Sequence, residues 1–554
     1  MTISMATRPE PALRGDLLDP VPRPLLDRVA TKERPAVLSA QLFSAGAAAG
    51  RPLPESGARW ARSAALAGDL DSALRLADRV IAEQRADRGE AALVAAAALA
   101  HRGQLAHSTE LYRWSGAGPA ASFATVGLIG TGHPAEVAGL PGTATVDGPP
   151  TLLAHGALLA ARGIGDSVTG TPISALGTLV RAADLLLPAG SAVLLPDSPA
   201  ALAALVALHY GELAVAESVL TRAIAAGLGG VLLAARHRLL LAWSLMVGGR
   251  TAAARQCLAA VRQAGRPLEA RDQLFALALD AALARRDSDL AAHRRAWLGA
   301  CELLMRHPVD LFMLLPLGEL AVAAARLGAH GHLATHLAEA DALLHRLGDP
   351  PLWTAPLHWS GLHAAIIAER PDLAAERAAT LARFAHASGF HTALAAAAEC
   401  WLAVLAGRID AGRAQAAARG LHAAGLCWDG ARLAAQAAIR TKDRKAMVVL
   451  LDCARQLQGR PTAERPGTAS AAGQPHPAPG GAAASDHPRL SGRERQVAAL
   501  VVAGLTYKQI GDRLFISPKT VEHHVARMRH RLDCGSRSDL LARLRDLVGA
   551  DRPT

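Results

Sequence analysis

The sequence has few aromatic residues for its length. Phe, Trp and Tyr make up 3% of 554 residues, whereas hydrophobic residues make up 51% and alanine occurs in almost every segment. Strands draw on β-branched and aromatic residues, while alanine favours helices. We therefore expect an all-α protein with a large buried core, and we exclude a β-sandwich and wholesale disorder.

Closely spaced cysteines are also absent. No two of the six cysteines have CxxC spacing, and none lies near a histidine in a zinc-like pattern. We expect buried, reduced thiols and neither a metal nor a cofactor. The six are Cys257, Cys301, Cys400, Cys427, Cys453 and Cys534.

Lysine is rare, and none of the five lysines follows a glycine-rich loop, so a phosphate-binding GxxxxGK[ST] motif is missing. HExxH and GxSxG motifs are missing too. The histidines are scattered, and we interpret His330, His332 and His336 as surface or capping residues rather than metal ligands. The sequence therefore nominates no catalytic residue, and we expect no enzyme.

Long uninterrupted hydrophobic runs are lacking. Residues 1–16 contain no apolar signal-peptide core, and glycine and proline break the apolar stretch 115–134. We expect a cytoplasmic, nucleoid-associated protein with no membrane partner.

Positive charge is concentrated at the C-terminus. The chain carries a formal net charge of +11, and residues 485–554 alone contain 13 Lys and Arg against 8 Asp and Glu. This surplus indicates an anionic partner, although a basic tail can also be ordinary solvated surface.

Composition divides the chain into four segments. We expect a disordered N-terminus (1–22), a helical-repeat sensor or interaction region (23–457), a flexible Pro/Gly/Ala linker (458–485) and a C-terminal helical domain (486–554). Residues 116–148, rich in Gly, Pro and Thr, are expected to interrupt the repeats as a long loop or a remnant of another element.

Weak self-similarity runs through the second segment. A Gly or Pro breaker with a polar residue recurs between stretches of helical periodicity, at 67–70, 102–105, 210–213, 249–252, 370–373 and 407–410. A period in the mid-thirties with one turn between two helices is typical of tetratricopeptide-type hairpins. The alternative is an ordinary irregular helical domain.

Capping signals predict four helices in the last segment. Ser491 and Glu494 form one capping box and Thr506 and Gln509 another, while Ser517 precedes Pro518 at the first position of a third helix and Ser536 caps a fourth. Along the third helix, apolar residues recur at spacings of four, three and four, which predicts a buried stripe. These residues are Val521, Val525, Met528 and Leu532.

The face opposite this stripe is basic and can form hydrogen bonds. Two short helices joined by a tight turn, with such a face on the second, are typical of a helix-turn-helix that reads the major groove. Glu522 can accept a hydrogen bond from cytosine, and His523 can reach a purine edge. A generic helix bundle with a solvated face is the alternative. The predicted DNA-binding residues are Thr506, Lys508, Ser517, Lys519, Thr520, Glu522, His523, Ala526, Arg527 and His530.

The segment also resembles a known family at specific positions. These are Leu490-Ser491, Arg493-Glu494-Arg495, Ala503-Gly504-Leu505-Thr506, Ile510-Gly511, Leu514-Phe515-Ile516-Ser517, Lys519-Thr520-Val521, His524 and Arg531-Leu532. Together they look like the four-helix DNA-binding domain of the LuxR family, which includes the NarL and FixJ response regulators. The resemblance implies a homodimer formed largely through residues 536–547, with Glu522, His523 and Ala526 facing base edges.

The second segment is loosely similar to the helical-repeat sensor region of MalT-type large LuxR regulators, in residues 196–199, 202–208 and 430–433. We expect a version without their ATPase domain, because no nucleotide-binding lysine motif is present. The leading hypothesis is a transcription regulator with promoter DNA, a second copy of the chain, RNA polymerase and a small-molecule or protein effector as partners. The alternative is an interaction scaffold for which DNA binding is secondary.

Overall fold

The computed structural model describes residues 57–116, 119–140, 151–458, 492–502, 505–514, 518–532, 534 and 537–549. Within these ranges the secondary structure is helical and no strand occurs, which confirms the all-α prediction. The predicted N-terminal segment 1–22 and, apart from residue 458, the predicted linker 458–485 lie outside the described residues.

Helices follow one another along residues 57–458 with short connections. The α-helices are α3 (Gly57–Ala67), α4 (Leu70–Ala82), α5 (Arg88–His101), α6 (Leu105–Ser115), α7 (Ala120–Gly130), α8 (Leu152–Thr169), α9 (Pro172–Leu186), α10 (Pro199–Tyr210), α11 (Leu213–Ala226), α12 (Gly230–Val247), α13 (Thr251–Gln263), α14 (Ala270–Asp287), α15 (Leu290–Leu304), α16 (Leu314–Arg326), α17 (Ala334–Arg346), α18 (Pro351–Ile367), α19 (Pro371–Arg383), α20 (Gly389–Leu405), α21 (Ala411–Ala423), α22 (Cys427–Arg440) and α23 (Arg444–Gln458). Short 3-10 helices are η1 (Pro134–Gly139), η2 (Leu187–Ala192), η3 (Leu311–Met313) and η4 (His330–Leu333).

All six turns predicted from the breaker pattern lie between consecutive helices. At the first, Gly68 adopts φ +83°, and the Asp69 side chain then caps α4 by accepting a hydrogen bond from Ser72 N at 2.9 Å. At another, Gly211 has φ +80°, and a Cβ there would lie 2.5 Å from the Ala424 carbonyl oxygen. Glycine is therefore required at this turn both for its backbone conformation and for close packing.

The helices form an inner and an outer layer. In inner helix α10, 11 of the 12 residues are buried, whereas outer helix α11 buries only four residues along one stripe. Alternate helices α10, α12, α14, α16, α18, α20 and α22 each contact the next. Each hairpin thus covers its apolar face with the next hairpin, as in tetratricopeptide-like arrays, and small alanine side chains allow the close approach.

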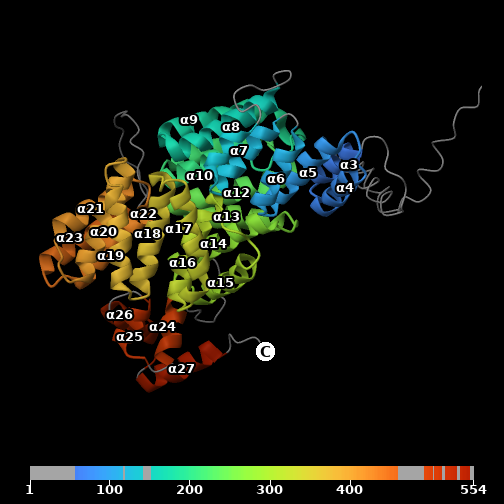
Figure 1. Cartoon of the computed structure of the whole chain (residues 1–554). Helices are drawn as coiled ribbons and strands as arrows, with labels where there is room; N and C mark the ends of the chain where they lie inside the picture. Colours follow the sequence, from blue (N-terminus) through green and yellow to red (C-terminus); the bar gives the residue numbers. More distant parts are fainter. Residues whose placement is uncertain are drawn as a thin grey trace, which may run out of the picture.

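The array curls so that distant helices meet. Helix α18 contacts α8 and α10, and Figure 1 shows α18 between α20 and α16, both of which it also contacts. Trp353 of α18 donates a hydrogen bond from Nε1 to Ser167 Oγ at 3.1 Å, and its ring lies 4.4 Å from the His209 ring of α10. These buried contacts hold the curvature of the array.

Of the two expectations for residues 116–148, a long loop or a remnant of another element, the long loop is wrong because residues 120–130 form α7. Nine of the 11 residues of α7 are buried. A Cβ at Gly127 would lie 2.0 Å from Thr109 Oγ1, and one at Gly130 would lie 2.7 Å from the Phe312 ring. Both glycines lie within a helix, and their lack of a Cβ permits tight packing against the neighbouring helices. Residues 117–118 and 141–150 lie outside the described residues.

Among the residues that the structure describes, two helical segments are long and apolar enough to cross a membrane by length and composition alone, Pro172–Ala192 and Gly230–Val247. Neither segment stands out in the sequence as a continuous apolar run of about 20 residues. Both pack within the array, α9 against α8 and α10 and α12 against α11 and α13. Helix α12 also carries the fully buried Arg236 in ion pairs with Asp197 and Asp272. These contacts account for α12 as a core helix of the array, whereas α9 packs against its neighbours on one side.

All six cysteines are free thiols, and four of them are buried. Burial raises the pKa of Cys400 to about 11. His336 Nε2 lies 2.9 Å from the Leu304 carbonyl oxygen and therefore donates to it. In the part of the chain that the structure describes, no group of three or more His, Cys, Asp or Glu side chains is placed to hold a metal ion.

Candidate nucleic-acid interface

In the described part of the last segment, four helices form a separate core. They are α24 (Gly492–Val502), α25 (Tyr507–Leu514), α26 (Pro518–Arg531) and α27 (Arg537–Gly549). Helix α24 contacts each of the other three, and α25 packs on α26. The core is built from buried residues of all four helices, including Val497, Ile510 and Leu544. The pair α25–α26 has the order expected of a helix-turn-helix.

Local capping sets where α25 begins. Thr506 Oγ1 accepts a hydrogen bond from Gln509 N at 3.3 Å, and Gln509 Oε1 accepts one from Thr506 N at 2.9 Å. This reciprocal pair confirms the second predicted capping box. Helix α26 begins at Pro518 as predicted, because proline lacks the N–H that a first helical position leaves unused. Ser491 and Ser536, the other predicted caps, lie outside the described residues.

The apolar stripe of α26 faces the domain core as its spacing predicts. Val521 and Met528 are fully buried, Leu532 is 3% exposed and Val525 is 8% exposed. Each such side chain contributes about 1.5–3 kcal/mol through the hydrophobic effect. The stripe therefore determines which side of α26 turns toward solvent.

The opposite side of α26 is open to solvent. Of the predicted DNA-binding residues on α26, those whose side chains the structure describes are all exposed: Lys519, Glu522, His523, Ala526 and Arg527. Thr506 and Lys508, at the start of α25, are exposed as well. Thr520 and His530 belong to α26, but their side chains are not among those described, and Ser517 lies outside the described residues.

The end of α26 is tied to α27. Arg543 donates a hydrogen bond from Nη1 to the Leu532 carbonyl oxygen at 2.6 Å. The Cys534 thiol, 8% exposed, also donates to this oxygen, at 3.5 Å. A cationic donor at a helix C-terminus satisfies a carbonyl that has no partner within the helix and favours the helix dipole. Sequence reasoning missed this role of Arg543, because the contact joins two helices.

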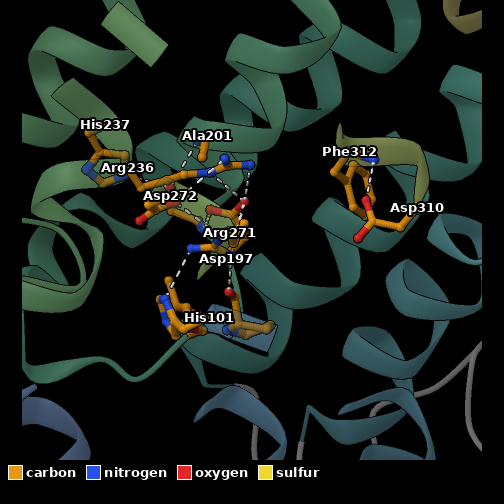
Figure 2. Close-up of polar contacts among 12 residues, drawn as sticks. His101, Asp197, Ala201, Arg236, His237, Arg271, Asp272, Asp310 and Phe312 are labelled. Atoms are coloured by element: carbon orange, nitrogen blue, oxygen red, sulfur yellow. Dashed lines mark hydrogen bonds and ion pairs between the residues drawn. The ribbon is translucent and has the colours of Figure 1, made fainter. Parts of the chain in front are cut away.

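A second polar site that the sequence did not reveal lies inside the repeat array. Figure 2 shows Arg236 of α12 and Arg271 of α14 approaching Asp197, with His101 on the far side of Arg271. Asp197 Oδ2 lies 3.1 Å from Arg236 Nη2 and 3.7 Å from Arg271 Nη1. Asp272 Oδ1 lies 3.2 Å from Arg271 Nε. Two arginines and two aspartates thus join α12, α14 and the start of α10.

Burial and charge together set the protonation states of this cluster. Burial alone would raise the pKa of Asp197, but Arg236 and Arg271 bring it below its ordinary value. Burial, with Arg271, lowers the pKa of His101 to about 3, so its ring is neutral. His101 Nε2 donates to the Leu195 carbonyl oxygen at 3.0 Å, and Nδ1 accepts from Arg271 at 3.1 Å. The arginines of the cluster are paired with carboxylates, and the adjoining cavity measures only about 50 Å³, so we assign the cluster a structural role.

Comparison with known proteins identifies the C-terminal domain. Residues 488–544 match the family described as bacterial regulatory proteins, luxR family. The spore germination protein GerE of Bacillus subtilis (strain 168) is 40% identical over 57 residues, which is 10% of this chain and 77% of GerE. The crystal structure of yeast Tom70 aligns with 73% of this chain and 88% of its own, at 11% identity and a TM-score of 0.26. The array is therefore defined by the contacts among its own helices.

The family match covers α24, α25, α26 and most of α27, including the exposed face of α26. It agrees with the resemblance carried by the sequence motifs and with the buried stripe that orients α26. The chain therefore belongs to the LuxR family of bacterial regulatory proteins and is a DNA-binding transcription regulator.

Proposed function

We propose that α26 lies in the major groove of promoter DNA and reads its sequence. The observation that carries this proposal is the exposed face of α26, which lies opposite the buried stripe. Lys519 and Arg527 on this face approach phosphates, whereas Glu522, His523 and Ala526 face base edges. Ser517, Thr520 and His530 belong to the same proposed surface.

Helix α25 contributes a second set of contacts. Thr506 and Lys508 are exposed at its N-terminus, where backbone N–H groups and the helix dipole favour an anion. In helix-turn-helix proteins the first helix crosses the DNA backbone. We assign these two residues to phosphate contacts that fix the orientation of α26.

We further propose that the active protein is a homodimer whose two copies pair through α27. Leu540 and Leu544 bury the inner side of α27 in the domain core, while Ala542 and Arg545 remain exposed on its other side. A two-fold dimer would place two copies of α26 on half-sites about one helical turn of DNA apart.

The repeat array is proposed to sense an effector in the cytoplasm and to control promoter binding or contact with RNA polymerase. Tetratricopeptide-like arrays provide extended surfaces for ligands and proteins. In this proposal, the array controls the activity of the protein at its promoters. In the scaffold alternative, the array binds its partners in the same way whichever promoter the chain occupies.

The test is a genomic footprint of the full-length chain, followed by binding to the sites recovered. We expect preference for a two-fold-symmetric site and an affinity that falls steeply as salt rises, because phosphate contacts release counterions. No preference among promoter sequences at physiological salt would favour the scaffold alternative.

A further inference from the structure

A second cavity in the array is larger than the one beside Asp197 and has a different charge. It measures about 520 Å³, within the range of about 300–1,000 Å³ typical of small-molecule sites. Its walls come from the α12–α13 turn, the ends of α14, α16 and α18, the length of α22 and the end of α23. We call it the arginine pocket, after Arg285, Arg286, Arg326 and Arg432, which line it together with Trp428.

Positive charge exceeds negative charge around the arginine pocket. Arg285 and Arg286 share one carboxylate, Glu319, at 2.9 Å from Arg285 Nη2 and 3.8 Å from Arg286 Nη1. Arg432 has the nearby Asp429 as its counter-charge. Among the residues that line the pocket, five are arginines, including Arg250 and Arg326, and one is acidic, Asp287.

The protonation equilibria reflect this surplus. Burial, with Arg285 beside it, lowers the pKa of Arg432 to about 10, and burial also lowers that of Arg286. The buried Nε atoms of Arg285 and Arg286 have no hydrogen-bond partner. A buried cation without full compensation favours an added anion over bulk water.

An indole ring holds the guanidinium groups in place. The guanidinium carbon lies 4.5 Å from the centre of the Trp428 ring for Arg285, 5.0 Å for Arg286 and 5.3 Å for Arg432. Cation–π contacts at this distance restrict the arginines before any ligand arrives. Since ordering arginine side chains is a main cost of anion binding, this arrangement is preorganised.

We propose that the arginine pocket binds a small organic anion carrying at least two negative charges, such as a phosphate ester or a polycarboxylate, as the effector of this regulator. Guanidinium forks match both carboxylate and phosphate oxygens. Met246, Ile367 and Ile439 supply apolar wall around the arginines, which favours an organic molecule over an inorganic ion.

The position of the pocket suggests how occupancy reaches the DNA-binding domain. Leu457 and Gln458, the last residues of α23, line the pocket, and the chain continues from there toward the LuxR domain. A ligand held between the arginines and α23 would stabilise this helix against the array. This effector role rests on the proposed promoter binding.

The direct test is calorimetric titration of the full-length chain with glucose 6-phosphate and citrate, using glucose as the uncharged control. We expect either anion to bind and glucose not to bind. Arg432→Gln should weaken anion binding by about tenfold or more, since it removes a charge-assisted contact. Arg222→Gln is the matched control, because Arg222 pairs with Asp184 outside the pocket, and it should leave anion binding unchanged.

A second pair of variants avoids the buried arginines. Ile439 lies at the pocket wall and is 44% exposed, so substitution there spares the core. Ile439→Glu should weaken anion binding by repulsion, whereas Ile439→Gln should not. Absence of binding by both anions at about 10 mM, or equal losses in Arg432→Gln and Arg222→Gln, would overturn the proposal.

Operator affinity measured with and without the bound anion separates the two claims. We expect the anion to change the affinity of the wild-type chain and not that of Arg432→Gln. Anion binding with unchanged operator affinity would refute the effector role. Operator binding without any anion binding would refute only this inference, while anion binding without operator binding would refute the proposed function.

Discussion

His209 is predicted to destabilise the repeat array as the pH falls. Its ring is 1% exposed in α10 and lies against Trp353 of α18. Nδ1 donates to the Leu205 carbonyl oxygen at 2.8 Å, and the buried Nε2 has no hydrogen-bond partner. Protonation would place an uncompensated charge at the contact between two inner helices, and burial accordingly lowers the pKa of His209 to about 4.

The sign and size of the change in unfolding free energy follow from proton linkage. Between the ordinary value of 6.5 and the folded value of about 4, the unfolded chain binds more protons than the folded chain. Stability is therefore complete above about pH 6.5 and is lost as the pH falls through this window. A pH of about 5 lies about 1.5 pH units below the ordinary pKa of histidine, and each unit is worth about 1.4 kcal/mol. His209 alone should therefore lower the unfolding free energy by about 2 kcal/mol at about pH 5.

His209→Phe tests this value directly. The substitution keeps an aromatic ring beside Trp353 and removes the titrating group. Its stability should depend on pH less steeply than that of the wild type, by about 2 kcal/mol between about pH 7 and about pH 5. His386→Phe, at an exposed histidine, is the control and should leave the pH dependence unchanged.

The assay is urea unfolding of the full-length chain followed by tryptophan fluorescence. All eight tryptophans lie between residues 60 and 428, so the signal reports on the array and not on the DNA-binding domain. If His209→Phe and the wild type lose equal stability on acidification, His209 is not held neutral by burial and the reasoning fails.

Further predictions concern the LuxR domain. Arg527→Ala should weaken binding to all DNA sequences about equally and reduce the slope of log affinity against log salt by about one, measured by fluorescence anisotropy. His523→Ala should instead relax preference at particular bases by about 1–3 kcal/mol, which binding to single-base operator variants will detect. Equal losses on every sequence for both variants would contradict the assigned orientation of α26. Arg543→Ala should destabilise the domain by about 1.5–3 kcal/mol, measured by hydrogen exchange of α26 amides, because the Leu532 carbonyl loses its charged donor. Met528→Ala should cost about 2–5 kcal/mol by the same measurement, and a near-neutral result would mean that the stripe is not the core of the domain.

Prediction from sequence succeeded where the signal is local. The Thr506 capping box, Pro518 at the start of α26 and the stripe from Val521 to Leu532 all depend on residues three or four positions apart, which meet on any helix. The same holds for the hairpin turns, such as those at Gly68 and Gly211, since a breaker ends a helix wherever it stands.

Local patterns misled or were silent where packing decides. The Gly-, Pro- and Thr-rich composition of residues 116–148 favoured a loop or a remnant of another element, yet Gly127 and Gly130 lie in α7, where Thr109 and Phe312 pack closely against them. Arg236 in an apolar stretch was the available signal for a buried ionic site, but its partner Asp197 is identified only when α10 and α12 are placed together.

The sequence by itself determined the helical class, the hairpin turns and the side of α26 that faces solvent, because each follows from periodicity and capping within about one or two helical turns. Only the tertiary structure decided that Arg285, Arg286 and Arg432 would meet around Trp428. They come from helices far apart in the chain, and the curvature that joins them is the sum of contacts made by every hairpin between them.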